Sequence, residues 1–335
     1  MTEPVLSIRG LTVPLPRGAD RANAIEGLSL DVAPGEIVCV VGESGSGKSV
    51  TASAVMGLLP PILTPSAGEI LLQGENVLRV GAARLRRLRG SRMAMVFQEP
   101  MTALNPVLKV GDQIDEMLKA HGGRSDAAAH PGRSGREGRR ARVLDLLADV
   151  HLPDPPSLAK AYPHQLSGGQ RQRVMIAMAL ANDPALIIAD EPTTALDVTT
   201  QAQILKLMKE LQARRDAGIL FITHDFGVVS EIADRVVVMR YGRLVEEGSV
   251  ESVLTRPQDP YTRMLIAAVP RAEPPPPRPR QPPAAPILAV RDLTKTYGGR
   301  GLFGGGRAVT ALDGVSFALQ PGETLGIVGE SGSGK

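Results

Sequence analysis

The sequence of 335 residues contains one cysteine, no tryptophan and only 3% aromatic residues. A single cysteine cannot form an internal disulfide, and there are no cysteine pairs for a zinc site. The scarcity of aromatic side chains leaves few surfaces on which bases of a single-stranded nucleic acid could stack. No apolar run approaches the roughly 18 residues that cross a bilayer, so we expect any membrane association to depend on a partner.

The overall composition is that of an ordinary globular protein, with 43% hydrophobic and 22% charged residues. The net charge is only +3. Much of the basic excess lies in two loop-like stretches, which we interpret as solvated surface loops rather than a nucleic-acid site. We therefore expect no nucleic-acid partner. The basic residues are Arg133, Arg136, Arg139, Arg140 and Arg142 in one stretch, and Arg271, Arg278 and Arg280 in the other.

A glycine-rich loop occurs twice. Residues 42–49 fit the phosphate-binding pattern G-x-x-x-x-G-K-[ST], and residues 329–335 repeat the first seven of them without change. The longer segments 35–48 and 322–335 agree at 10 of 14 positions, a repeat with a period near 287 residues. The second copy lacks the hydroxyl residue that follows the lysine and binds Mg²⁺. We expect the chain to be the front part of a longer tandem ATPase.

The repeat and the composition together predict three segments. A complete ATP-binding domain is expected over residues 5–270, and a fragment of a second domain over residues 287–335. Residues 271–286 lie in a stretch with nine prolines among the 17 residues from 270 to 286. Such a stretch favours an extended spacer over a packed element, so we predict a linker there.

The fold class predicted for the first domain is α/β. Turn signals and alternating apolar positions over residues 5–41 indicate short strands in an antiparallel layer. Buried-strand candidates at residues 185–189, 219–222 and 236–239 alternate with helical patterns, which indicates a mainly parallel core. Helix-like stretches between residues 104 and 165 are expected to form a helical subdomain, interrupted by a flexible loop over residues 121–138.

The first glycine-rich loop lies between a predicted strand, residues 37–41, and a predicted helix, residues 49–59. In that context its backbone N–H groups can surround phosphate oxygens at the positive end of the helix. The lysine supplies a charge to the β- and γ-phosphates, and the serine after it supplies a hydroxyl to Mg²⁺. We predict that ATP binds to Gly42, Glu43, Ser44, Gly45, Ser46, Gly47, Lys48 and Ser49.

Two carboxylates end the apolar strand predicted at residues 185–189. They lie at the carboxyl edge of the sheet, where α/β folds place their ligands. We predict that Asp190 holds Mg²⁺ and that Glu191, next to the γ-phosphate, is the general base for the attacking water.

Four further motifs make the domain resemble an ABC-type ATPase with the P-loop NTPase fold. Residues 166–170 match the signature motif, whose serine precedes Asp190 by 23 residues. The resemblance implies that Gln98 of the Q-loop senses metal and water, and that His224 of the switch motif contacts the γ-phosphate. Residues 195–197 match the D-loop. The signature residues, implied to bind the nucleotide of a partner domain, are Ser167, Gly168, Gly169 and Gln170.

The resemblance narrows to the importer branch for dipeptides, oligopeptides and nickel. Its markers are residues 99–106, 162–166 and 257–263. Because two ATPase copies are expected in one polypeptide, the chain resembles the fused glutathione and dipeptide import ATPases of that branch. One departure is Leu15, which stands where the family has an aromatic residue stacked on adenine. A leucine offers no such stack, so adenine binding by this half is expected to be weaker or to come from elsewhere.

The resemblance implies a peripheral ATPase on the cytoplasmic face of the bacterial inner membrane that energises a peptide importer. Its implied partners are integral-membrane permease subunits and a second ABC domain, either in the same polypeptide or in a homodimer. An extracytoplasmic solute-binding protein would act with it indirectly. The alternative is a ribosome-associated tandem ABC ATPase acting in translation. Such proteins usually join their two copies by a long charged helix, whereas here the joint is proline-rich.

Overall fold

The computed structural model describes residues 3–121, 135–194, 196–269, 285–297, 309–329 and 333–335. Two compact units are distinguished: the first comprises residues 1–196 and 200–270, and the second residues 271–335 grouped with residues 197–199. Most of the predicted linker lies outside the described residues. So do Ala195 of the D-loop and Glu330, Ser331 and Gly332 of the second glycine-rich loop.

A six-stranded sheet forms the centre of the first unit, with its strands in the order β10-β9-β3-β8-β7-β6. Neighbouring strands are parallel except β10, which is antiparallel to β9. Three of these strands are buried along almost their whole length, as expected of a parallel sheet covered on both faces. The strands are β3 (Ile37–Val41), β6 (Met93–Val96), β7 (Leu186–Asp190), β8 (Gly218–Ile222), β9 (Arg235–Arg240) and β10 (Arg243–Ser249).

Alternate residues of β3 contribute to two separate cores. Ile37, Cys39 and Val41 pack in one hydrophobic cluster with helices of the far side, whereas Val38 and Val40 pack in the other with the antiparallel layer. This division follows from the pleat of a strand, which points successive side chains to opposite faces. Both cores therefore fix β3, the strand that leads into the glycine-rich loop.

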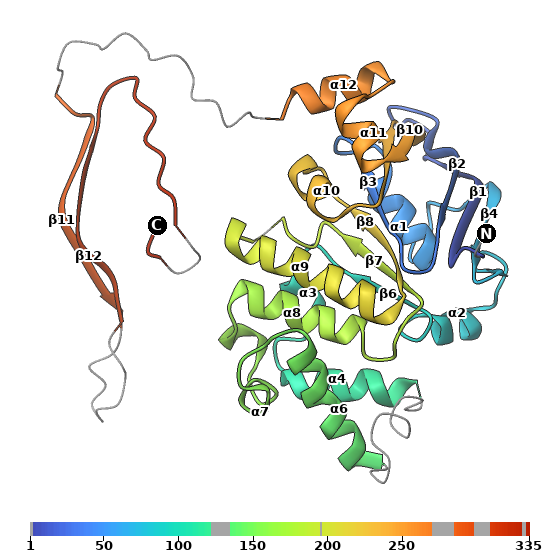
Figure 1. The fold of residues 1–335 in the computed structure, drawn as a ribbon, viewed down its shortest axis with the longest axis horizontal. Helices are drawn as coiled ribbons and strands as arrows, with labels where there is room; N and C mark the ends of the chain where they lie inside the picture. The colour runs from blue at the N-terminus through green and yellow to red at the C-terminus, as the bar shows by residue number, and fades with distance from the viewer. Residues whose placement is uncertain (1–2, 122–134, 195, 270–284, 298–308, 330–332) are drawn as a thin grey trace. The chain divides into compact units, whose positions relative to one another are not determined.

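The antiparallel layer has four strands in the order β2-β1-β4-β5. It covers the second core together with α1, which begins at the end of the glycine-rich loop. Figure 1 shows this layer and α1 on one side of the central sheet, with α8 and α9 on the other. The elements are β1 (Leu6–Pro14), β2 (Asn23–Val32), β4 (Ala67–Leu72), β5 (Glu75–Asn76), α1 (Lys48–Met56) and α2 (Ala82–Leu88).

The other face of the sheet carries the remaining helices, including a helical subdomain between β6 and β7. In the part of the chain that the structure describes, no helix combines the length and apolar character needed to cross a bilayer. The helices are α3 (Pro100–Ala103), α4 (Val110–Ala120), α6 (Gly135–Asp149), α7 (Pro155–Leu158), the 3₁₀ turn η1 (Pro163–Gln165), α8 (Gly168–Ala179), α9 (Val198–Arg215), α10 (Phe226–Ile232), α11 (Val250–Thr255) and α12 (Pro260–Ala267).

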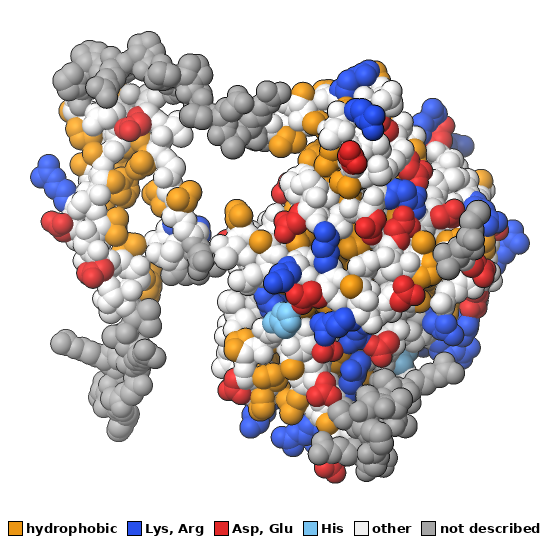
Figure 2. Space-filling view, in the orientation of Figure 1, with side chains coloured by type: hydrophobic (Ala, Val, Ile, Leu, Met, Phe, Trp, Pro, Cys, Tyr) orange, Lys and Arg blue, Asp and Glu red, His pale blue; other side chains and the backbone are white. Residues whose placement is uncertain are grey.

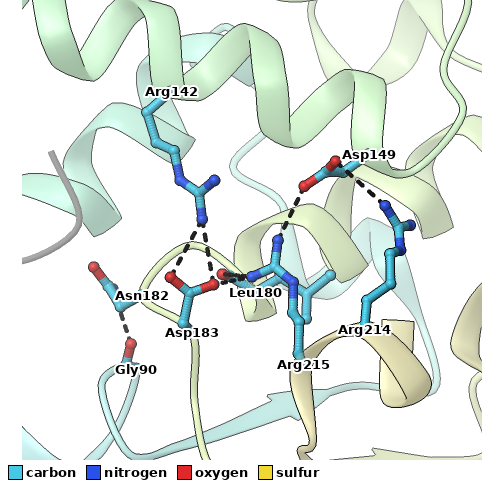
Figure 3. A network of polar contacts seen from close by, with 8 residues as sticks. All are labelled: Gly90, Arg142, Asp149, Leu180, Asn182, Asp183, Arg214 and Arg215. Atoms are coloured by element: carbon cyan, nitrogen blue, oxygen red, sulfur yellow. Dashed lines mark hydrogen bonds and ion pairs between the residues drawn. The ribbon is translucent and has the colours of Figure 1, made fainter. Parts of the chain in front are cut away.

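A polar network ties the helical subdomain to α9 (Figure 3). Asp183, in the turn between α8 and β7, pairs with Arg142 of α6 at 3.3 Å and with Arg215 of α9. Arg215 also lies 3.0 Å from Asp149 at the end of α6. The Arg142 side chain is only 11% exposed, so this pairing compensates a charge that water hardly reaches.

The network corrects the interpretation of one basic stretch as a solvated loop. Helix α6 begins at Gly135, inside the segment predicted as a flexible loop, and residues 122–134 of that segment lie outside the described residues. Arg139 pairs with Asp115 of α4 at 2.7 Å, and Arg142 with Asp183. Carboxylates from distant elements hold these arginines, which the local sequence could not reveal. On the face that Figure 2 shows, basic and acidic side chains of the first unit are interspersed.

The second unit contains a two-stranded antiparallel hairpin of β11 (Leu288–Tyr297) and β12 (Val309–Leu319). It reproduces the pairing of β1 with β2, as the repeat implies. In both copies the lysine ammonium of the glycine-rich loop donates to the carbonyl of the first glycine: Lys48 to Gly42 and Lys335 to Gly329.

The predicted α/β fold class is confirmed, with a mainly parallel core, an antiparallel layer and a helical subdomain. The predicted strands agree with β7, β8 and β9 to within one residue at each end. The helix predicted to reach residue 59 ends at Met56, because Gly57 adopts a left-handed conformation that caps it.

Candidate functional site

The glycine-rich loop connects β3 to α1 through a backbone that only glycine can follow. Gly42 has φ 150° and Gly47 has φ 104°. A Cβ atom on Gly42 would lie 2.2 Å from the carbonyl oxygen of Met239, and one on Gly47 would lie 2.7 Å from that of Ala24. At both positions the backbone of another strand approaches closely, and both have a positive φ that L-residues rarely adopt.

Lys48, the first residue of α1, points into the loop. Its side chain is buried, and its ammonium donates to the carbonyls of Gly42 at 2.7 Å and Glu43 at 2.9 Å and to the Ser46 hydroxyl at 3.4 Å. Burial lowers the pKa of Lys48, while the negative charge of Glu191 opposes the shift. Neutral carbonyls only partly compensate a buried cation, so an anionic ligand would find a favourable place here.

Ser49 and Asp190 meet at the carboxyl edge of the sheet. The Ser49 hydroxyl donates to the Asp190 carboxylate at 3.1 Å, joining α1 to the end of β7. Burial raises the pKa of Asp190; the Ser49 hydrogen bond opposes this shift, and the nearby Glu191 charge reinforces it. A cation bound between these two oxygens would relieve the cost of burying that carboxylate.

Glu191 is the point where three motifs meet, since its carboxylate contacts the Q-loop glutamine and the switch histidine. One carboxylate oxygen accepts from Gln98 Nε2 at 3.2 Å and from the Thr194 hydroxyl at 3.0 Å, and the other lies 3.2 Å from His224 Nδ1. The backbone of Glu191 has φ 46°, a left-handed conformation that is uncommon outside glycine. Its N–H donates to Ile222 at 2.9 Å, so the adjacent strand β8 holds the residue in this strained turn.

These residues line one cleft with a volume of about 790 Å³. Its polar wall comprises Lys48, Ser49, Gln98, Glu191 and His224, which are separated by up to 176 positions in the sequence. Its apolar lining residues are Leu15, Ala24, Val50 and Leu63, and the Arg21 side chain also lines it. The cleft therefore offers both charged groups and apolar surface to a ligand.

The signature residues do not line this cleft. Ser167 caps α8: its hydroxyl accepts from the Gln170 N–H at 3.2 Å, and its own N–H donates to the Gln170 side chain at 2.9 Å. A Cβ on Gly169 would lie 2.5 Å from Thr200 of α9, whereas one on Gly168 would meet no atom closer than 3.8 Å. The N-terminus of α8 therefore lies outside the residues that line this cleft.

Three residues at or near the cleft were not identified from the sequence. Thr194 donates to Glu191, and Arg21 donates to the carbonyl of Gly45 at 2.5 Å. Tyr261 of α12 hydrogen-bonds to Glu43 in the loop. The sequence carried a signal only for Tyr261, which lies inside the importer-type marker at residues 257–263.

The residues present fit Mg²⁺ and a nucleotide triphosphate. Within the described ranges, no three His, Cys, Asp or Glu side chains gather as a metal site of their own. Mg²⁺ in nucleotide sites does not need one, because it takes one or two protein oxygens and completes its shell with phosphate oxygens and water. Ser49 and Asp190 offer such a pair, and Lys48 stands beside it.

Comparisons with known proteins find related sequences. A family model described as ABC transporter matches residues 25–194, and one described as oligopeptide/dipeptide transporter, C-terminal region, matches residues 245–299. The chain is 48% identical to the peptidoglycan transport ATP-binding protein YejF of Agrobacterium fabrum, covering 100% of this chain and 59% of that protein. It is 46% identical to the glutathione import ATP-binding protein GsiA of Salmonella typhimurium, covering 99% of this chain and 56% of that protein. The chain thus spans less than two thirds of the length of these relatives.

Solved structures of ATP-binding cassettes share the fold. A dimeric post-hydrolysis state of the cassette MJ0796 bound to ADP and Pi has a TM-score of 0.62 and 29% identity, covering 73% of this chain and 98% of that one. The cassette cbiO1 from Clostridium perfringens, part of the transporter complex cbiONQ, has a TM-score of 0.61 and 28% identity, covering 76% and 92%. The chain therefore shares the fold of these cassettes.

Proposed function

The chain belongs to the ABC transporter family of ATPases, in the oligopeptide/dipeptide branch predicted from its motifs, and from this premise we propose that it binds and hydrolyses ATP to energise an importer of peptides or peptide-like solutes. The observation that carries the proposal is that Lys48, Ser49 and Glu191 line one cleft and that the Ser49 hydroxyl donates to Asp190.

In this proposal each residue has a separate role toward Mg²⁺·ATP. The loop N–H groups and the Lys48 ammonium hold the phosphates, and the carbonyls of Gly42 and Glu43 keep that ammonium in the loop. Ser49 and Asp190 hold the metal, with Gln98 nearby. Glu191 accepts the proton of the attacking water, and His224, 3.2 Å from its carboxylate, orients it and approaches the γ-phosphate.

Hydrolysis requires a second ABC domain. The signature helix α8 presents Ser167 to Gln170 away from the cleft that contains Lys48. The proposal is that the nucleotide binds between this cleft and the signature helix of a partner domain. That partner is a second domain of the same polypeptide or another copy of the chain, and the dimeric cassettes among the structural relatives support such a pairing.

Coupling to transport would occur through permease subunits in the membrane. Several large apolar side chains near Gln98 are exposed, among them Phe97, Met101 and Val107, which is 76% exposed. An apolar surface beside the catalytic residues is suited to contact a permease and to report on the nucleotide. The protein would lie at the cytoplasmic face of the inner membrane, and an extracytoplasmic solute-binding protein would select the solute.

The ATPase rate of the purified chain, measured against protein concentration, tests the two-domain site. Because the proposed site needs the signature helix of a second ABC domain, the rate per chain should rise with concentration as copies pair. Ser167→Arg, which places a bulky cation where the partner's phosphate is expected, should abolish this rise. A rate per chain that is constant at high dilution and unaffected by Ser167→Arg would contradict the proposal.

Co-purification from membranes tests the transport assignment. A pair of permease subunits retained with the tagged chain would support an importer. Retention of ribosomal subunits instead would favour the translational alternative and refute the importer.

A further inference from the structure

Helix α12 lies near the C-terminal end of the first unit and contacts the glycine-rich loop through Tyr261. It lies within the segment matched by the oligopeptide/dipeptide C-terminal model. Tyr261 of this helix is buried, with only 4% of its surface exposed. Its hydroxyl contacts Glu43, which is 218 positions away in the sequence. Helix α12 is therefore packed directly against the glycine-rich loop.

The Tyr261 hydroxyl makes two hydrogen bonds to one loop residue. It accepts from the backbone N–H of Glu43 at 3.1 Å and donates to the Glu43 carboxylate at 3.2 Å. Burial raises the pKa of Tyr261, so the phenol stays protonated and remains a donor at neutral pH. The two bonds fix the direction of the hydroxyl, because one uses its lone pair and the other its proton.

The N–H that Tyr261 holds belongs to the same peptide unit as the Gly42 carbonyl. That carbonyl accepts from the Lys48 ammonium at 2.7 Å. In a trans peptide the N–H and C=O groups point in opposite directions, and none of the described peptide bonds is cis. Tyr261 and Lys48 therefore hold the two ends of one peptide plane. Rotating that plane would release both contacts at once.

The tyrosine itself is fixed on three sides. The Arg240 guanidinium lies 4.6 Å from the centre of its ring. Asp259 caps α12 and accepts from the Tyr261 N–H at 2.8 Å. Glu246 of β10 accepts the N–H groups of Gln258 at 2.7 Å and of Asp259 at 3.1 Å, which joins the start of the helix to the central sheet.

We propose that Tyr261 is a positioning residue for ATP binding, which orients the Gly42–Glu43 peptide and through it the Lys48 ammonium. The inference rests on the proposed nucleotide site at Lys48. Without the hydroxyl, the free loop samples orientations that do not hold Lys48 in place. The apparent affinity for ATP then falls by the fraction of chains whose loop is competent to bind.

The test is Tyr261→Phe in the 335-residue chain, which keeps the buried ring and removes only the hydroxyl. Titration with a fluorescent ATP analogue in the presence of Mg²⁺ should give a dissociation constant about three- to tenfold higher than that of the parent, the factor that one net hydrogen bond corresponds to. The thermal midpoint without nucleotide should fall by less than about 4 °C. Tyr241→Phe is the matched control: that tyrosine is 60% exposed in the adjacent turn, and its variant should bind like the parent.

A second variant separates the peptide from the carboxylate. Glu43→Ala removes the carboxylate acceptor but leaves the backbone N–H to the tyrosine hydroxyl, so it should weaken ATP binding less than Tyr261→Phe does. An effect equal to that of Tyr261→Phe would overturn the role of the peptide. A lowered thermal midpoint with unchanged affinity in Tyr261→Phe would show a structural role alone and overturn the inference.

The same titrations separate this inference from the proposed function. If the parent binds the analogue and Lys48→Ala weakens binding while Tyr261→Phe does not, only the inference fails. If the parent does not bind the analogue, or Lys48→Ala binds as well as the parent, both fail.

Discussion

Replacing Glu191 with glutamine should suppress hydrolysis and leave ATP binding intact. The parent carboxylate accepts from Gln98 and Thr194 through one oxygen, at 3.2 and 3.0 Å, and lies 3.2 Å from His224 Nδ1 through the other. A glutamine can keep its oxygen toward Gln98 and Thr194 and turn its amide nitrogen toward Nδ1 of His224. The side chain then keeps its place, and only its capacity to take a proton is lost.

The expected loss of rate follows from losing proton acceptance while the hydrogen bonds of the side chain are kept. Proton acceptance by a positioned base is worth about 10²- to 10⁴-fold in rate, so phosphate release should fall by at least about 100-fold. The folding free energy should change by less than about 1 kcal/mol, because the hydrogen bonds are conserved. The affinity for ATP should be equal or higher, since the change removes a negative charge from the neighbourhood of Lys48 and of the incoming phosphates.

The assay is phosphate release, followed at a protein concentration where the parent exceeds the buffer blank, together with titration of a fluorescent ATP analogue. Glu69→Gln provides the matched control, because it makes the same chemical change in β4, where the carboxylate pairs with Arg9 outside the cleft. The control should hydrolyse ATP like the parent. If Glu191→Gln retained a rate within about threefold of the parent, Glu191 would not be the base.

Three further variants test the loop, the apolar wall and the subdomain anchor. Gly47→Ala should lower the free energy of unfolding by about 2–4 kcal/mol in urea titrations, because its Cβ would lie 2.7 Å from a carbonyl oxygen of β2. The control Gly27→Ala is also at positive φ but has no atom within 4 Å, so it should cost only about 1 kcal/mol. Equal losses in the two variants would contradict the steric argument. Leu15→Tyr should tighten ATP binding by about fivefold by giving the base a ring to stack on, and unchanged affinity would mean that the base binds elsewhere. Asp183→Asn should destabilise the chain by about 1–2 kcal/mol, because it removes the charge that compensates Arg142, and an unchanged urea midpoint would show that the network in Figure 3 contributes nothing.

Much of the fold could be predicted because buried parallel strands are legible as short apolar runs. The run at residues 37–41 is buried on both faces, and its place before the glycine-rich loop predicted the order strand, loop, helix. Element ends were less predictable. The end of α1 depends on the left-handed turn at Gly57, and the start of α6 depends on contacts with α4 that no local pattern announces.

The site was predictable where residues form motifs and not where they form contacts. Glu191 was predicted from its place at the end of an apolar strand, and Gln98 and His224 from a resemblance to family motifs. The structure brings the three within hydrogen-bond distance. The contact of Tyr261 with the loop crosses 218 positions and depends on a single hydroxyl. Likewise, the left-handed backbone of Glu191 follows from its bond to β8, which only the folded chain defines.

The central claim, that ATP binds in the cleft beneath Lys48, is tested most directly by equilibrium titration of Lys48→Ala with a fluorescent ATP analogue and Mg²⁺. The account predicts a dissociation constant at least about tenfold higher than that of the parent, because the variant removes a buried charge from the place where the phosphates are proposed to bind. Lys119→Ala, whose lysine side chain is 61% exposed on α4, should bind like the parent. An unchanged dissociation constant for Lys48→Ala would contradict the claim and place the nucleotide elsewhere.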